Sequence, residues 1–391
     1  MSFDTLTDVP LHRIFDYLDL KTLLQSLSCT CSYLHEAVRS YNAFQLDSIP
    51  ISTDDIKRIR TSIPAQNIIS LMIIGSDQTQ ISELSEFINL QRLTLVGINY
   101  TLLNNIFTHI TSTRLRTLSI KIPWLSRKEI RDIFDILLLF IHQSNVTNLL
   151  LDISDIQLKK QNGQETLFNM MQPFINILRC LNIFYCCYRS YKQILTSYSS
   201  LQSLEINHLQ VDYSGNILLD LSTDIVQFRS QLTSLTLNSY ELSIDNLRLL
   251  LQLTPLLKNL HLTHNHSHYD FNTMCNGFFW ANFIKLNLKF LKTFQFTFGH
   301  HVGSHTSYTQ YPHEIIARFK TPFWLEDKHW HVQCEFNLST SNVIVSTQSI
   351  DPISNSETIF RCNSISATDI SYVILNKYRT SDLESKYTEE V

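Results

Sequence analysis

The segment LQRLTL at residues 90–95 shows the pattern that decides the fold. Its last two leucines are two residues apart, so on a β-strand their side chains share one face. Arg92 and Thr94 alternate with them and share the other face. The segment therefore predicts a half-buried strand, and its first leucine closes the turn that leads into the strand.

The same pattern occurs nine times when Ile, Val or Phe may replace Leu. The copies are IISLMI at 68, LQRLTL at 90, LRTLSI at 115, VTNLLL at 146, LRCLNI at 178, LQSLEI at 201, LTSLTL at 232, LKNLHL at 257 and LKTFQF at 291. Successive copies start 22 to 34 residues apart. The average of about 28 lies near the upper end of the range for leucine-rich repeats.

Helical patterns lie between the copies, at 102–110, 130–141 and 244–253. A strand followed by a helix cannot bury its apolar face alone, so stacked units share one core. We therefore expect an α/β fold in which an irregular leucine-rich-repeat solenoid carries a concave parallel sheet, with the helices on its convex side.

The residues that alternate with the buried ones line the concave sheet and are the predicted substrate-binding surface. Such a surface could also be merely solvated at any one position. The candidates are Arg92, Thr94, Thr117, Ser119, Asn148, Asn182, Glu205, Thr236, Asn259, His261 and Gln295.

Residues 8–41, DVPLHRIFDYLDLKTLLQSLSCTCSYLHEAVRSY, contain three short apolar sets at helical spacing. Asp8 is a candidate N-cap, and Pro10 falls in the first turn, where a missing N–H costs little. Three short helices follow. A unit of this size rarely sustains a core alone, so part of its apolar surface should meet another protein.

Residues 6–38 resemble an F-box, a family that usually opens with Leu-Pro-x-Glu and carries Ile-Phe-x-Tyr-Leu some positions later. The match is carried by Leu6, Ile14, Phe15, Tyr17 and Leu18. Thr7 stands where the family usually has Pro, and Val9 where it often has Glu.

Together with the repeats, this resemblance implies a substrate receptor of a Skp-cullin-F-box ubiquitin ligase. The F-box would bind the Skp-type adaptor and through it a cullin, and the repeats would bind a protein substrate. The resemblance implies no catalytic residue in the chain. The adaptor-binding residues that it implies are Leu6, Leu11, Ile14, Phe15, Leu18, Leu23, Leu24 and Leu27.

A different interpretation is a non-catalytic leucine-rich-repeat scaffold with no ligase link, whose N-terminal helices only cap the solenoid. Thr7 and Val9 are consistent with it.

The chain divides by pattern into five segments. They are an F-box at 1–43, a linker or N-terminal cap at 44–67, the solenoid at 68–300, an aromatic C-terminal cap at 301–348, and a Ser-rich, partly mobile tail at 349–391. Within the aromatic segment, HVQCEFN and VIVST read as strands. A ligand-binding extension is the alternative for this segment.

Composition and charge argue against several classes of function and location. The 391 residues carry a net charge of −4, which argues against a dominant nucleic-acid surface. The N-terminus does not read as a secretory signal, and no apolar run reaches the roughly 20 residues that span a bilayer, so we expect no membrane association and an intracellular protein, cytoplasmic or nuclear. Eight cysteines without a CxxC pair suit a reducing compartment.

The sequence gives little support for catalysis or for metal binding. Seven glycines are too few and too scattered for a phosphate-binding loop, and there is no GxSxG motif. His261, His264, His266 and His268 could hold a metal, but we expect the first on a strand and the others in the exposed loop after it. We therefore expect no cofactor and no enzyme.

Overall fold

The computed structural model describes most of the repeat region and smaller parts of the ends. The described residues are 34, 36, 38, 44–51, 63–74, 81–110, 113–122, 127–153, 167–210, 230–238, 242–264, 271–301, 311–337, 342–347, 359–363 and 373–374. The chain forms two compact units. The first is Met1–Tyr185 with Ser197–Leu201, and the second is Cys186–Thr196 with Gln202–Val391.

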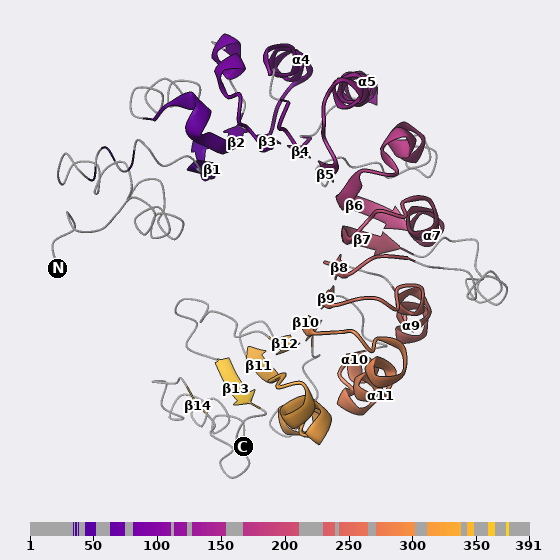
Figure 1. Cartoon of the computed structure of the whole chain (residues 1–391). Helices are drawn as coiled ribbons and strands as arrows, with labels where there is room; N and C mark the ends of the chain where they lie inside the picture. Colours follow the sequence, from indigo (N-terminus) through magenta and orange to yellow (C-terminus); the bar gives the residue numbers. More distant parts are fainter. Residues whose placement is uncertain are drawn as a thin grey trace, which may run out of the picture. The chain divides into compact units, whose positions relative to one another are not determined.

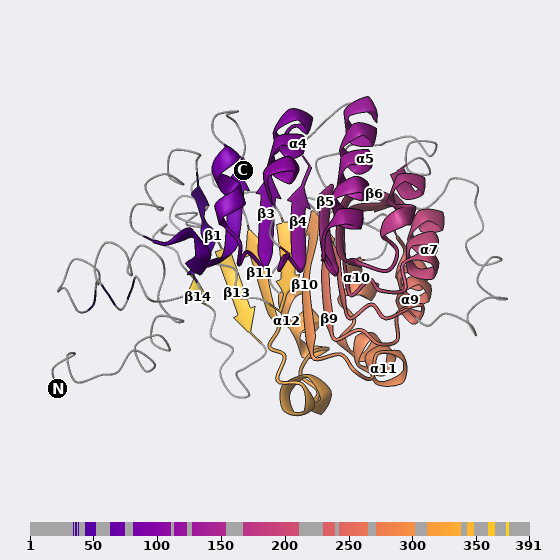
Figure 2. The ribbon, with the colours of Figure 1, turned by 45° about the horizontal axis from the view of Figure 1, so that its top comes forward.

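The first unit contains a ladder of parallel strands in sequence order (Figures 1 and 2). Their bounds are β1 Phe44–Ile51, β2 Ile68–Ile74, β3 Arg92–Val96, β4 Thr117–Lys121, β5 Asn148–Ile153 and β6 Leu178–Cys187, whose last two residues belong to the second unit.

The second unit continues the pattern with four parallel strands and then changes to antiparallel pairing. β10 pairs with β12, β12 with β11, β11 with β13, and β13 with β14. The bounds are β7 Ser203–Gln210, β8 Ser234–Leu237, β9 Asn259–His264, β10 Thr293–His301, β11 Gln333–Asn337, β12 Asn342–Ser346, β13 Ile359–Asn363 and β14 Val373–Ile374. All nine strands predicted from the repeat, β2 to β10, are confirmed.

Apolar side chains of the repeat lie opposite one another across the ladder. In the first unit Leu71, Leu93, Leu118 and Leu149 are in register, and each is at most 1% exposed. Each leucine is enclosed by the leucines of the neighbouring strands, so the core is continuous although the repeats differ in length.

Backbone hydrogen bonds between the turns keep neighbouring repeats in register. The N–H of Arg116 donates to the carbonyl of Gln91 (2.9 Å), and the N–H of Thr147 donates to the carbonyl of Arg116 (2.9 Å). In the second unit the N–H of Lys258 donates to the carbonyl of Thr233 (2.8 Å). These turn donors are therefore satisfied by carbonyl groups of the neighbouring repeat.

The helices lie along one side of the strands within each unit, as Figure 1 shows for α4 and α5 and for α9 and α11. The bounds are α4 Tyr100–His109, α5 Arg127–Gln143, α7 Tyr188–Ser197, α9 Ile244–Gln252, α10 Phe271–Met274, α11 Gly277–Asn287 and α12 Tyr311–Ala317. The three predicted helices, α4, α5 and α9, are confirmed. None of the helices in the described ranges is long and apolar enough to cross a membrane.

Polar side chains fix where several of these helices begin. The Asn99 side chain accepts a hydrogen bond from the N–H of Leu102 (2.8 Å) at the start of α4. Ser243 accepts one from the N–H of Asn246 (3.3 Å) at the start of α9. These caps satisfy donors that the first helical turn leaves without an intrahelical partner.

Strand β1 is a difference from the sequence analysis, which assigned residues 44–67 to a linker or N-terminal cap. Phe44 and Leu46 pair with Ile68 and Leu71, and the register shifts before Ile51. Pro50 falls at this shift. Proline cannot donate to a ladder and is tolerated at such irregularities, so its presence does not exclude a strand. The segment lacks the repeat pattern, which is why it was missed.

The aromatic segment packs against the last parallel strand. Trp324 is buried, and its ring centroid lies 6.1 Å from that of Phe294. Its indole N–H donates to the carbonyl of Gly277 (3.0 Å). A Cβ at position 277 would clash with the Arg318 carbonyl, so this close approach requires glycine. The predicted strands in this segment, β11 and β12, are confirmed. Strand β13, which pairs with β11, lies in the segment that was assigned to a tail.

Two substitutions on one strand test which face of the ladder forms the core. Leu95 is buried and Thr94 is half-buried on the opposite face. We expect Leu95→Ala to lower the free energy of unfolding by about 3 kcal/mol, because it leaves a cavity. Thr94→Ala should change it by about 0.5 kcal/mol or less. Urea unfolding followed by circular dichroism measures both, and equal effects would contradict the assigned faces.

Candidate protein-interaction surface

The residues that alternate with the buried positions form one face of each unit's parallel strands, which we call the interleaved face. All eleven candidates lie on it, and each is half-buried or exposed. Six are in the first unit: Arg92, Thr94, Thr117, Ser119, Asn148 and Asn182. Five are in the second: Glu205, Thr236, Asn259, His261 and Gln295. The structure thus shows where they lie, while their role in binding stays a prediction.

In the second unit four candidates form one row. Glu205, Thr236, His261 and Gln295 occupy matching positions on β7, β8, β9 and β10. The row combines a carboxylate, a hydroxyl, an imidazole and an amide, and can therefore both donate and accept hydrogen bonds.

A second row adds residues that the sequence analysis missed. The Asn238 side-chain amide donates to a carboxylate oxygen of Glu205 (2.9 Å) and to the side-chain oxygen of Asn207 (2.7 Å). The first bond holds the Glu205 carboxylate in place, and the second ties Asn207 to the same amide. Asn207 and Asn238 each lie just beyond the six-residue motif. Continuing the alternation two residues past Glu205 would have found Asn207.

Burial affects the charge of His261. Its partial desolvation lowers the pKa below the usual histidine value, while the nearby Glu205 carboxylate opposes this shift by raising the pKa. The net direction is downward, so the imidazole is neutral near pH 7.

The interleaved face of the first unit is more mixed. It includes the apolar side chains of Met72 and Leu150 and the thiol of Cys180. Burial raises the pKa of this thiol, so it stays protonated and unreactive. Lys121 and Asp152 form an ion pair (3.6 Å) on adjacent strands. Both side chains are partly exposed, so the pair adds little stability.

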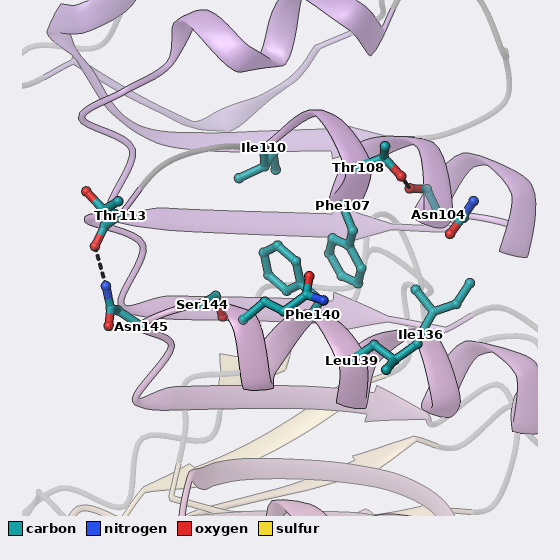
Figure 3. Close-up of a pocket in the computed structure, with 11 residues that line it drawn as sticks. Asn104, Phe107, Thr108, Ile110, Thr113, Ile136, Leu139, Phe140, Ser144 and Asn145 are labelled. Atoms are coloured by element: carbon teal, nitrogen blue, oxygen red, sulfur yellow. Dashed lines mark hydrogen bonds between the residues drawn. The ribbon is translucent and has the colours of Figure 1, made fainter.

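A groove between α4 and α5 is a separate surface of the first unit (Figure 3). The rings of Phe107 and Phe140 stack at 4.0 Å, and Leu139 is 63% exposed at its side. The groove has a volume of about 500 Å³, and apolar side chains, amides and hydroxyls line it. At one end the Asn145 amide donates to the carbonyl of Thr113 (2.9 Å). The repeat pattern gave no signal for this groove.

The predicted adaptor-binding residues, Leu6, Leu11, Ile14, Phe15, Leu18, Leu23, Leu24 and Leu27, lie outside the described residues. Two later residues of the third helical pattern are described. Leu34 and Val38 are helical and buried.

The histidine cluster differs from its prediction at one position. His264, expected in a loop, is the last residue of β9 and is buried. It lies on the apolar face because it continues the alternation of Leu260 and Leu262. His266 and His268 lie outside the described residues. Across the described ranges, no group of three His, Cys, Asp or Glu side chains could hold a metal ion.

Comparison with known proteins identifies the N-terminal segment. An F-box domain model matches residues 3–45, which confirms the F-box expected there. No curated protein matches the chain. Among solved structures, an internalin from Listeria monocytogenes is 15% identical, with a TM-score of 0.29, and the match covers 75% of this chain and 78% of that one. The assignment of the leucine-rich-repeat-like fold depends on the strand register described above.

Replacing Glu205 tests the electrostatics of the row. We expect the His261 pKa to lie below the usual value of about 6.5, and Glu205→Gln to lower it further because the stabilising charge is lost. Histidine NMR titration, with His261→Gln for assignment and the exposed Glu326→Gln as control, measures both. The folded pKa lies below the unfolded one, so His261 should destabilise the fold as the pH falls below about 6.5. A pKa that rises in Glu205→Gln would contradict this account.

Proposed function

We propose that the chain is the substrate-recognition subunit of a Skp-cullin-F-box ubiquitin ligase. The observation that carries the proposal is an F-box at residues 3–45 in the same chain as a repeat ladder with a largely polar interleaved face. F-box domains are in general binding modules for Skp-type adaptors. The adaptor would join the chain to a cullin, and the interleaved face would hold a protein substrate.

The adaptor contact would be made by apolar side chains of the F-box. The eight residues implied by the family resemblance include Leu18 and Leu23, which lie in successive helical patterns. A module of about 40 residues has too little core to bury all such side chains itself, and a partner can cover the remainder.

Substrate recognition would depend on hydrogen bonding more than on net charge. Thr236, Asn259 and Gln295 are neutral donors and acceptors on adjacent strands, and Glu205 contributes one carboxylate. Rigid strands hold these groups at fixed spacing, so a partner with matching groups loses little conformational entropy at this surface.

The chain itself would perform no chemistry. By holding a substrate at one end and the ligase at the other, it would raise the effective concentration of substrate lysines near the ubiquitin-charged enzyme. This role requires no catalytic residue and no cofactor, and it places the protein inside the cell, where such ligases act.

A second candidate is a leucine-rich-repeat interaction scaffold without a ligase link. The departures of Thr7 and Val9 from the usual F-box opening favour it. The two candidates differ in one measurable property, which is adaptor binding.

Adaptor binding should require the apolar F-box side chains. We expect the full chain to bind the host's Skp-type adaptor, and Leu18→Asp or Leu23→Asp to weaken binding by about a hundredfold, because each places a carboxylate in an apolar contact. Isothermal calorimetry measures this. Leu139→Asp is the matched control, since Leu139 is exposed on α5 and should have no effect. Full-strength binding by both F-box variants would contradict the assigned contact.

Substrate capture should depend on the interleaved face and not on the F-box. We expect Thr236→Arg to remove most co-purifying substrate, because a long charged side chain blocks the middle of the row, while adaptor affinity stays unchanged. Quantitative mass spectrometry of proteins that accumulate on the tagged chain during proteasome inhibition measures this. Arg131→Glu, on the exposed side of α5, is the control. An unchanged set of captured proteins would argue against the interleaved face.

A further inference from the structure

Large apolar side chains are exposed at the end of α11 and at the turns that enter the last two parallel strands. Leu256 is 41% exposed, Leu286 is 74% exposed and Phe290 is 58% exposed. Leu256 and Phe290 each precede the first leucine of a repeat motif, and those leucines, Leu257 and Leu291, are buried. The repeat therefore accounts for the buried residues but not for the exposed ones.

Two hydrogen bonds bring the segments that carry these residues together in the second unit. The N–H of Lys292 donates to the carbonyl of Lys258 (2.8 Å), which places the two turns side by side. The Gln252 amide donates to the side-chain oxygen of Asn287 (3.4 Å) and joins α9 to α11. We call this surface the α11 edge and define it by Leu256, Lys258, Leu286, Lys289, Phe290 and Lys292. Figure 1 shows α11, which carries Leu286, and the strands β9 and β10, which follow the turns that carry the other five residues.

The α11 edge is positively charged. Lys258, Lys289 and Lys292 are exposed. The Lys328 ammonium is also close, because it donates to the carbonyl of Leu291 (2.8 Å). A nearby acid, Asp327, lies 3.9 Å from the Lys285 ammonium.

Exposed apolar groups clustered on one surface lower stability in water unless another molecule covers them. Here three exposed lysines, Lys258, Lys289 and Lys292, accompany three large exposed apolar side chains, and the Lys328 ammonium lies beside them at the Leu291 carbonyl. The complementary ligand has carboxylates arranged around apolar side chains, and opposite charges at such a contact both steer association and fix the orientation of the partner.

We propose that the α11 edge binds an acidic amphipathic segment of a partner protein. Leu, Phe or similar side chains of the segment lie against Leu256, Leu286 and Phe290, and its Asp and Glu side chains face the lysines. The surface is distinct from the interleaved face and does not depend on the ligase role. Exposed Glu326 and Asp327 near Lys328 favour a segment with localised charges over a uniformly anionic membrane.

A selection on the full chain tests the proposal. A random library of 16-residue peptides on phage is panned on the wild-type protein after clearance on Leu286→Gln/Phe290→Gln. Both positions are exposed, so this variant should fold. We expect the enriched peptides to combine Asp or Glu with large apolar residues.

Fluorescence anisotropy with the most enriched peptide measures its affinity for the wild type and for each variant. We expect Leu286→Gln/Phe290→Gln to weaken binding by about a hundredfold, from about tenfold for each apolar contact. Lys289→Glu/Lys292→Glu should weaken it by about tenfold, and raising NaCl from about 0.05 to about 0.3 M should weaken it severalfold. Ile88→Gln, at a side chain that is 54% exposed in the first unit, and Arg131→Glu on α5 are the matched controls and should bind as the wild type does.

Three results would overturn the proposal. The first is a selection that enriches no peptide over the cleared background. The second is enrichment of peptides without acidic residues, which would remove the role of the lysines. The third is binding to vesicles with about 30% phosphatidylserine by the wild type but not by the double apolar variant, when neither binds peptide. That result would identify an anionic membrane as the occupant.

Discussion

Burial of apolar side chains between neighbouring repeats is the constraint on which the rest of the structure depends. A strand with a helix behind it leaves Leu93 and its equivalents open on both sides, and the strands before and after it close that space. Because the leucines must stay in register, the alternating residues are also brought into rows. The core therefore determines the geometry of the surface proposed to bind substrate, although the two sets of residues lie on opposite faces of the strands.

This dependence explains what could be predicted. The two-residue alternation of LQRLTL fixed strand positions and faces, so all nine repeat strands and all eleven candidate surface positions lie where expected. Strand β1 was missed because FQLDSIPI pairs through its backbone without the motif, and backbone pairing leaves no side-chain signature. Asn207 and Asn238 were missed because the alternation was not continued past the six-residue motif. Their hydrogen bond joins residues about thirty positions apart, and no local pattern reveals that contact.

The exposed hydrophobic side chains show a second kind of residue that the repeat pattern does not predict. Leu256 and Phe290 look like core residues in the sequence, since each stands beside the first leucine of a motif. Only the structure shows that the motif leucines Leu257 and Leu291 are buried, while Leu256 and Phe290 are exposed. In the same way His264 looks like a loop histidine, yet it continues the buried face of β9. Composition alone cannot distinguish these cases, because one residue of shift reverses the face.

The account combines a domain that joins the chain to a ligase with a repeat surface that holds a target. Its central claim is tested most directly by mixing the purified full chain with the Skp-type adaptor and the N-terminal part of the cullin, and measuring the mass by size-exclusion chromatography with light scattering. The account predicts one species with the chain, adaptor and cullin at equal stoichiometry. A chain that elutes separately from an intact adaptor–cullin pair would contradict it and leave the scaffold as the better description.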